Sequence, residues 1–222
     1  ERARYGGILA DIASHQADQF LFFTGATRAE VVAAQVANWA HPQWPGLEDF
    51  GEMLLRADGA TGYVRVDWYT PDGLGTWGDG RTILLGDKGS IELRKYVDVA
   101  RDKSGNHVYL VDQAGEHHFE VEGKVGFRFF GELILDCLHR TEKAMTQAHA
   151  FKAAEPGIRV LDLPLDATRA GEDHELPCHP IRSALARRPQ DQRGRQQVVV
   201  PAVGARADQG LVEGDLLPCH LL

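Results

Sequence analysis

The chain has 222 residues, of which 43% are hydrophobic and 25% are charged, and its formal net charge is -8. This composition suits a globular protein with a buried core, and the acidic balance lacks the clustered Lys and Arg of nucleic-acid binders, so we expect no nucleic acid as a partner. No apolar run is long enough to span a membrane, so we expect no membrane partner, and three cysteines are too few for a disulfide framework, which favours the cytoplasm.

The first predicted element is an amphipathic helix over residues 7–23, because apolar side chains recur there at intervals of three and four. We expect the helix to end near Gly25. The pair Gly6-Gly7 precedes it. Because glycine has no Cβ, we expect another segment or a ligand to approach the backbone closely at this point.

From residue 29 the pattern changes to a period of two, which is typical of strands. It predicts strands over residues 30–39, 51–57 and 61–69, the last two joined by a hairpin turn at Asp58-Gly59. Further strands are predicted over residues 82–85, 90–97, 107–111 and 116–121, because glycine-containing turns separate these apolar and β-branched runs.

Residues 126–155 have one apolar stripe, which predicts a single long helix that Pro156 ends. The chain order is therefore helix, strands, helix. It predicts an α+β fold in which an antiparallel, open-faced β-sheet has helices packed on one face.

Composition changes sharply at residue 156. All aromatic residues and all lysines precede this position, whereas most prolines lie at or after it. Because aromatic side chains supply much of the apolar area of a core, we predict a domain over residues 1–155 and a poorly ordered, irregular tail over residues 156–222. Two origins of the tail stay open: a genuine disordered segment, or an out-of-frame reading of a GC-rich gene.

Residues 73–78 satisfy the G-x-G-x-x-G pattern of dinucleotide-binding folds. In those folds the glycines open a helix that faces the pyrophosphate, whereas here a predicted strand follows within a few residues. We therefore interpret the segment as a loop. We expect no metal site either, because a zinc site needs three or four convergent ligands.

Asp11 and His15 are the strongest candidates for chemistry, since they stand four apart on the first predicted helix. Side chains at this spacing project side by side, so a carboxylate can hold the imidazole in one tautomer and raise its basicity. Such a pair can move a proton. An ordinary structural contact between the two side chains is the other interpretation.

The segment from Tyr5 to Asp18, with its Gly-Gly, Asp, His and Asp, resembles the opening of the second domain of the Gfo/Idh/MocA oxidoreductases, a family that includes glucose-fructose oxidoreductase and inositol dehydrogenase. Other segments look like parts of the same domain, in order: residues 68–73, 76–81, 86–92 and 139–142. The resemblance covers roughly residues 4–155 and stops at Pro156.

The resemblance implies transfer of hydride between a hydroxyl of a sugar, polyol or cyclitol and NAD or NADP. His15 would accept the hydroxyl proton and Asp11 would orient His15, because a base that titrates near neutral pH suits this step. The candidate substrate-binding residues are Tyr69, Trp77, Arg81 and Asp18. Aromatic faces pack on sugar rings and arginine donates to hydroxyls, but Tyr69, Trp77 and Arg81 are equally consistent with sheet surface and turn.

The family's nucleotide domain and its Lys-Pro dipeptide have no counterpart in this sequence. We therefore predict a fragment of an oxidoreductase that turns nothing over alone. The alternative is a non-catalytic module that self-associates through its β-sheet, and a homo-oligomer is expected in either case. A metal-dependent isomerase or lyase ranks last.

Overall fold

The computed structural model describes residues 6–76, 78–96, 98–99, 101–102, 105–160 and 195–201. The helices are α2 (Ile8–Asp11), α3 (Ser14–Thr24), α4 (Arg128–His139) and α5 (Gln147–Arg159). The strands are β1 (Glu30–Ala37), β2 (Phe50–Ala57), β3 (Ala60–Asp67), β4 (Gly80–Gly86), β5 (Gly89–Arg94), β6 (His107–Val111), β7 (Glu116–Glu120) and β8 (Arg195–Pro201).

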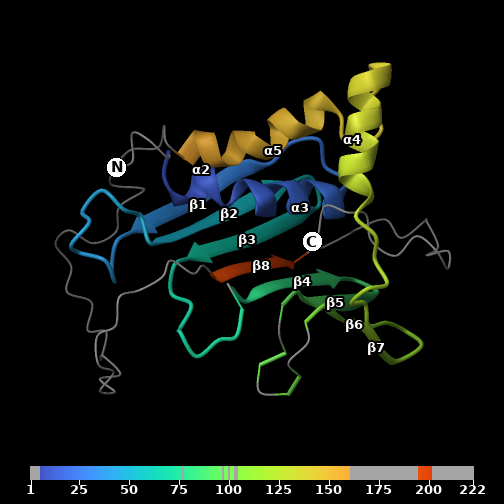
Figure 1. Cartoon of the computed structure of the whole chain (residues 1–222), viewed down its shortest axis with the longest axis horizontal. Helices are drawn as coiled ribbons and strands as arrows, with labels where there is room; N and C mark the ends of the chain where they lie inside the picture. Colours follow the sequence, from blue (N-terminus) through green and yellow to red (C-terminus); the bar gives the residue numbers. More distant parts are fainter. Residues whose placement is uncertain are drawn as a thin grey trace.

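The strands form one sheet in the order β1-β2-β3-β8-β4-β5-β6-β7. Helices α2, α3 and α5 lie over the β1–β3 part of one face, and α4 projects away from the sheet (Figure 1). All described strand pairs are antiparallel except the parallel pair β4 and β8. The predicted α+β class, an open-faced antiparallel sheet with helices on one face, is confirmed.

Local turn signals located the hairpins well. Asp58 and Gly59 form the two-residue turn between β2 and β3, and Gly59 has a φ of 76°, a left-handed conformation that glycine adopts without strain. Residues 107–111 form β6 with the bounds that the sequence predicted. The residues of these segments and their immediate neighbours were sufficient to predict both elements.

The core lies between the helices and the first three strands. Leu9, Ala13 and Phe20 are buried on the helical side, and they pack in one cluster with Val64 and Val66 of β3. Because side chains alternate along a strand, Tyr63 and Arg65 point to the opposite face of the sheet. The helices of the described structure leave that opposite face open (Figure 1).

The predicted helix over residues 7–23 is two helices in the structure. Helix α2 ends at Asp11, and α3 begins at Ser14. Between them the backbone forms a 3₁₀-type turn, in which the His15 N–H donates to the Ile12 carbonyl oxygen at 3.2 Å, an i to i-3 bond. Asp11 and His15 therefore lie on either side of a helix break, which the apolar period does not reveal.

The single long helix predicted over residues 126–155 is also wrong. Helix α4 ends where Arg140 adopts a left-handed conformation with φ 56°. The Asp136 carboxylate then accepts hydrogen bonds from the Thr141 hydroxyl and, at 2.8 Å, from the Ala144 N–H. The Thr146 hydroxyl accepts from the amide of residue 149 and starts α5. Side-chain caps thus override a continuous apolar stripe.

Pro156 does not end a helix, since α5 continues through it to Arg159. The predicted domain boundary at residue 155 therefore falls inside α5. The strand β8 was not predicted either, although Val198, Val199 and Val200 are β-branched residues typical of a strand. The remaining residues after position 160 lie outside the described structure, so the division into domain and tail stays a prediction.

Gly157 brings α5 close to the backbone of α2. A Cβ at this position would lie 2.7 Å from the Leu9 carbonyl oxygen and 3.1 Å from the Ala10 Cα. We expect Gly157→Ala to lower the free energy of unfolding by about 1–3 kcal/mol, because the two helices would have to separate. Urea unfolding of the purified chain measures the effect.

Gly131 in α4 is the matched control, since nothing lies within 4 Å of a Cβ built there. Gly131→Ala should be neutral or raise stability by about 0.5–1 kcal/mol, because alanine favours a helix over glycine. Equal losses for the two variants would show that the contact between α2 and α5 does not limit stability.

No helix in the described part of the chain has both the length and the apolarity needed to cross a bilayer.

Candidate functional site

One end of the sheet gathers the start of α2 and the loop that carries Tyr69. The register places Ala37, Phe50 and Asp67 side by side across β1, β2 and β3. The loops of residues 38–49 and 68–79 therefore leave the sheet at the same end, toward the left of Figure 1. We call this the loop end of the sheet.

Glu48 ties the loop of residues 38–49 to α2. Its carboxylate oxygen Oε2 accepts a hydrogen bond of 2.9 Å from the Ile8 N–H, and this contact is buried. Gly7 has a φ of 94°, and a Cβ there would overlap the Glu48 carboxylate. The close approach predicted at the glycine pair is confirmed, and the segment that approaches is the loop of residues 38–49.

Asp11 and His15 are both exposed. The buried positions of α2 and α3, such as Leu9 and Ala13, point into the core, so the pair occupies the outer surface of the helices. Among the contacts of the described residues, no hydrogen bond joins the two side chains. The pair is open to a ligand, and its role in proton transfer stays a prediction.

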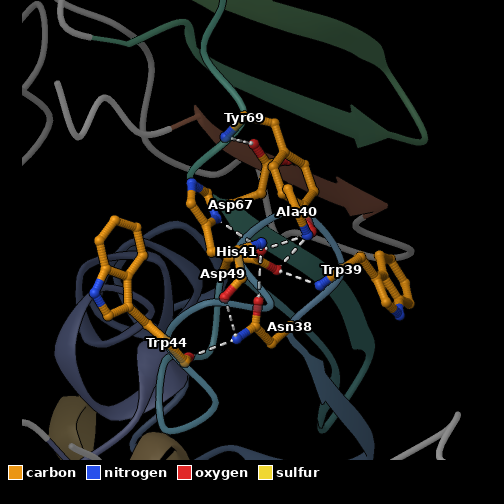
Figure 2. Close-up of polar contacts among 8 residues, drawn as sticks. All are labelled: Asn38, Trp39, Ala40, His41, Trp44, Asp49, Asp67 and Tyr69. Carbon is orange, nitrogen blue, oxygen red and sulfur yellow. Dashed lines mark hydrogen bonds and ion pairs between the residues drawn. The ribbon is translucent and has the colours of Figure 1, made fainter. Parts of the chain in front are cut away.

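Asp49 is the centre of a hydrogen-bond network at the loop end (Figure 2). It is fully buried, and its carboxylate accepts from the Trp39 N–H at 3.0 Å and the Ala40 N–H at 2.8 Å. The Tyr69 hydroxyl donates to it at 2.7 Å, and His41 Nδ1 lies at 2.8 Å. An ionised carboxylate only accepts, so Nδ1 carries the proton of His41.

Burial alone would raise the pKa of Asp49, but the hydrogen bonds from Tyr69, His41, Trp39 and Ala40 outweigh it and hold the pKa below the ordinary value of 3.8. Asp49 is therefore ionised at neutral pH. This charge fixes the loop of residues 38–49 against the chain that leaves β3.

Tyr69 is the sequence-predicted substrate residue that this network holds. Burial, with the hydrogen bond to Asp49, raises the pKa of its hydroxyl well above the ordinary value, so the hydroxyl stays protonated. Its hydrogen is used by Asp49, and its oxygen can still accept a hydrogen bond. A contact between Tyr69 and a substrate stays a prediction.

Asp18 and Arg81 already have protein partners. Asp18 Oδ1 lies 2.5 Å from Nε2 of His149, a contact that joins α3 to α5. Arg81 forms an ion pair of 3.0 Å with Asp79. Trp77 lies outside the described residues.

Arg81 does not converge with Asp11 and His15. The register pairs Arg65 with Gln197 and Gln197 with Arg81, and residues paired directly across a sheet lie on the same face. Arg65 lies on the open face, opposite the helices. The structure therefore brings Tyr69 to the end of the sheet where α2 begins, and places Arg81 on the opposite face.

A cleft of about 850 Å³ lies at the other end of the first strands. Its walls are residues 24–31, the hairpin residues 56–58 and the α5 side chains Lys152, Glu155 and Arg159. None of the candidate residues lines it. We therefore keep the candidate site at the loop end.

Sequence reasoning missed Glu48, Asp49 and His41. No spacing rule links a histidine to an aspartate eight positions later, and the partners of Asp49 come from separate segments of the chain. The one available signal was a pair of acidic residues placed directly before a strand, where burial of a carboxylate requires several donors.

Comparison with known proteins supports the family resemblance over the first part of the chain. Residues 1–92 match the model of the GFO/IDH/MocA C-terminal domain. The chain is also similar to a solved structure from Erwinia carotovora atroseptica SCRI1043, which its description assigns as an oxidoreductase, with 50% identity and a TM-score of 0.72. That match covers 77% of this chain and 50% of the other, so this chain spans about half the length of its structural neighbour. No curated protein matches it. The chain therefore contains a GFO/IDH/MocA C-terminal domain, matched over residues 1–92, and the resemblance that its sequence indicated is confirmed.

Proposed function

We propose that this chain provides the substrate-binding half of an NAD(P)-dependent oxidoreductase that acts on a sugar, polyol or cyclitol. The observation that carries the proposal is the exposed pair Asp11 and His15, which lies within the segment that matches the family. Both side chains are accessible, and neither is sealed in the core.

The described residues do not fit a nicotinamide nucleotide by themselves. The glycine-rich residues 73–78 belong to the loop between β3 and β4, and the described part of that loop opens no helix. A pyrophosphate site of the usual kind needs such a helix. In the proposed enzyme the coenzyme would accept hydride, and residues outside those described would bind it.

His15 is the proposed proton acceptor for the substrate hydroxyl. Oxidation of an alcohol to a carbonyl removes the hydroxyl proton, and a neutral imidazole can take it near physiological pH. Asp11 is the proposed positioning residue, because a nearby carboxylate favours the imidazolium that forms. The break between α2 and α3 separates the two residues, and no hydrogen bond joins their side chains among the described contacts. Binding of substrate would therefore have to bring the two side chains together.

A chimaera tests the proposal. In it, this chain replaces the matching half of the Erwinia protein, and absorbance at the nicotinamide band reports hydride transfer with a panel of sugars and polyols. We expect the chimaera to oxidise at least one of them and the 222-residue chain alone to be inactive. Turnover by the chain alone, or reaction of the chimaera with none of the panel, would contradict the proposed function.

Two further parts of the proposal concern the assembly and its location. We propose self-association through the open face of the sheet, since the described helices α2, α3 and α5 cover only the other face. We also propose a cytoplasmic location, which the free, exposed thiol of Cys137 supports, because exposed thiols persist in reducing compartments. Sedimentation at several concentrations measures the first.

A further inference from the structure

Two tryptophans of the loop of residues 38–49 are exposed, Trp39 by 58% and Trp44 by 55%. Large aromatic side chains bury much apolar area when a ligand covers them, so an exposed ring that the fold holds in place is a candidate ligand contact. The two rings lie on opposite sides of the Asp49 network (Figure 2). They therefore face different surroundings.

Trp39 already has a stacking partner. Its ring lies 4.5 Å from the Phe50 ring at an interplanar angle of 27°. The Arg65 guanidinium covers the Phe50 ring at 5.0 Å, which places this stack on the open face of the sheet. One face of Trp39 is thus used in the fold, away from Asp11 and His15.

Hydrogen bonds to its backbone hold Trp44 in place, while its side chain stays exposed. The Asn38 side-chain amide donates to the His41 carbonyl oxygen at 3.0 Å and to the Trp44 carbonyl oxygen at 2.8 Å. The Trp44 N–H donates to the His41 carbonyl oxygen at 3.0 Å. These bonds fix the turn before a ligand arrives, so little conformational entropy is lost on binding.

Trp44 also belongs to the loop that is attached to α2. Four residues beyond it, Glu48 holds the Ile8 N–H at the start of that helix. The buried His41 ring, which the Asp49 network holds through Nδ1, lies 6.1 Å from the Trp44 ring and so helps to position it. A pyranose or cyclitol ring has apolar C–H faces that match an exposed, preset indole ring.

We propose that Trp44, beside His41, is the stacking wall of the substrate site and recognises the apolar face of a cyclic sugar or cyclitol. This inference rests on the proposed function and assigns a specificity residue to it. Trp44 determines which ring shapes bind, whereas His15 acts on the hydroxyl that reacts.

The test uses the full chain labelled with 15N and the indole N–H signals of its tryptophans, titrated with D-glucose, myo-inositol and the open-chain polyol D-sorbitol. We expect the Trp44 signal to move saturably with a ring compound and less with sorbitol. Trp44→Ala should weaken binding of that compound about tenfold and Trp44→Phe about threefold or less, whereas Trp39→Ala should change it by less than about twofold.

The inference is overturned if the Trp44 signal stays unchanged with both ring compounds, or if Trp39→Ala weakens binding as much as Trp44→Ala. It is also overturned if the Trp44 signal moves with protein concentration in the absence of sugar, because a second copy would then cover the ring. Failure of the proposed function has a different signature: the Trp44 signal would respond to the ring compound while the chimaera transfers no hydride.

Discussion

Replacement of His15 by alanine is expected to reduce turnover of the chimaera about 100-fold to 10,000-fold, the range that a positioned general base contributes. The affinity for NAD(P) should stay nearly unchanged, since the proposed role of His15 is to take the proton of the substrate hydroxyl. Steady-state kinetics give the turnover, and nucleotide fluorescence gives the affinity. Because the side chain is exposed, its removal should cost little stability.

His117→Ala is the control for the loss of a histidine. His117 is an exposed residue of β7, which lies at the other edge of the sheet from the strands β1–β3 that α2 and α3 cover. This variant should keep full turnover. If His15→Ala weakened nucleotide binding and left the maximal rate intact, the assignment of His15 as the proton acceptor would be wrong.

Asp49→Asn is expected to lower the free energy of unfolding by about 2–4 kcal/mol, the range for breaking a buried, charge-assisted network. Asn has nearly the same shape, but one carboxylate oxygen becomes an NH₂ group. That group would face donors such as the Ala40 N–H, and the donors would lose their acceptor. Urea unfolding at neutral pH measures the loss.

The effect of Asp49→Asn should depend on pH in a defined direction. The pKa of Asp49 is lower in the folded chain than its ordinary value of 3.8. Its contribution to stability is therefore fully present above that ordinary value, and it is lost as the pH falls through the folded pKa. The difference between wild type and variant should shrink in this acid range.

Asp72→Asn is the matched control, because Asp72 is exposed in the loop that follows β3. Its effect should stay within about 0.5 kcal/mol at every pH, as is usual for exposed positions. A loss for Asp49→Asn no larger than that of the control would mean that the Asp49 network does not hold the loop of residues 38–49 in place.

Elements with local causes were predictable. The turn at Asp58 and Gly59 needs only a glycine that can adopt a left-handed backbone, and the strand over residues 107–111 is bounded by turns on both sides. The sequence around Asp11 and His15 was also sufficient to indicate the family, because the motif residues are contiguous in the chain.

Elements that depend on distant partners were not predictable. The end of α4 depends on Asp136 accepting from residues beyond the helix, and the continuation of α5 past Pro156 accompanies its close packing on α2. The strand β8 needed β3 and β4 as neighbours on both sides. A periodic pattern contains no information about these contacts.

The sequence by itself determined the fold class, the hairpins of the sheet and the identity of the two residues proposed for proton transfer, because each follows from side-chain periodicity, turn chemistry or a contiguous motif. Only the tertiary structure decided that Tyr69 lies at the loop end of the sheet and that Arg81 lies on the face opposite the helices. It also decided that Asp49 joins residues 39–41 to Tyr69. The physical reason is that a buried carboxylate needs several donors at once, and only the folded chain brings donors from different segments to one point.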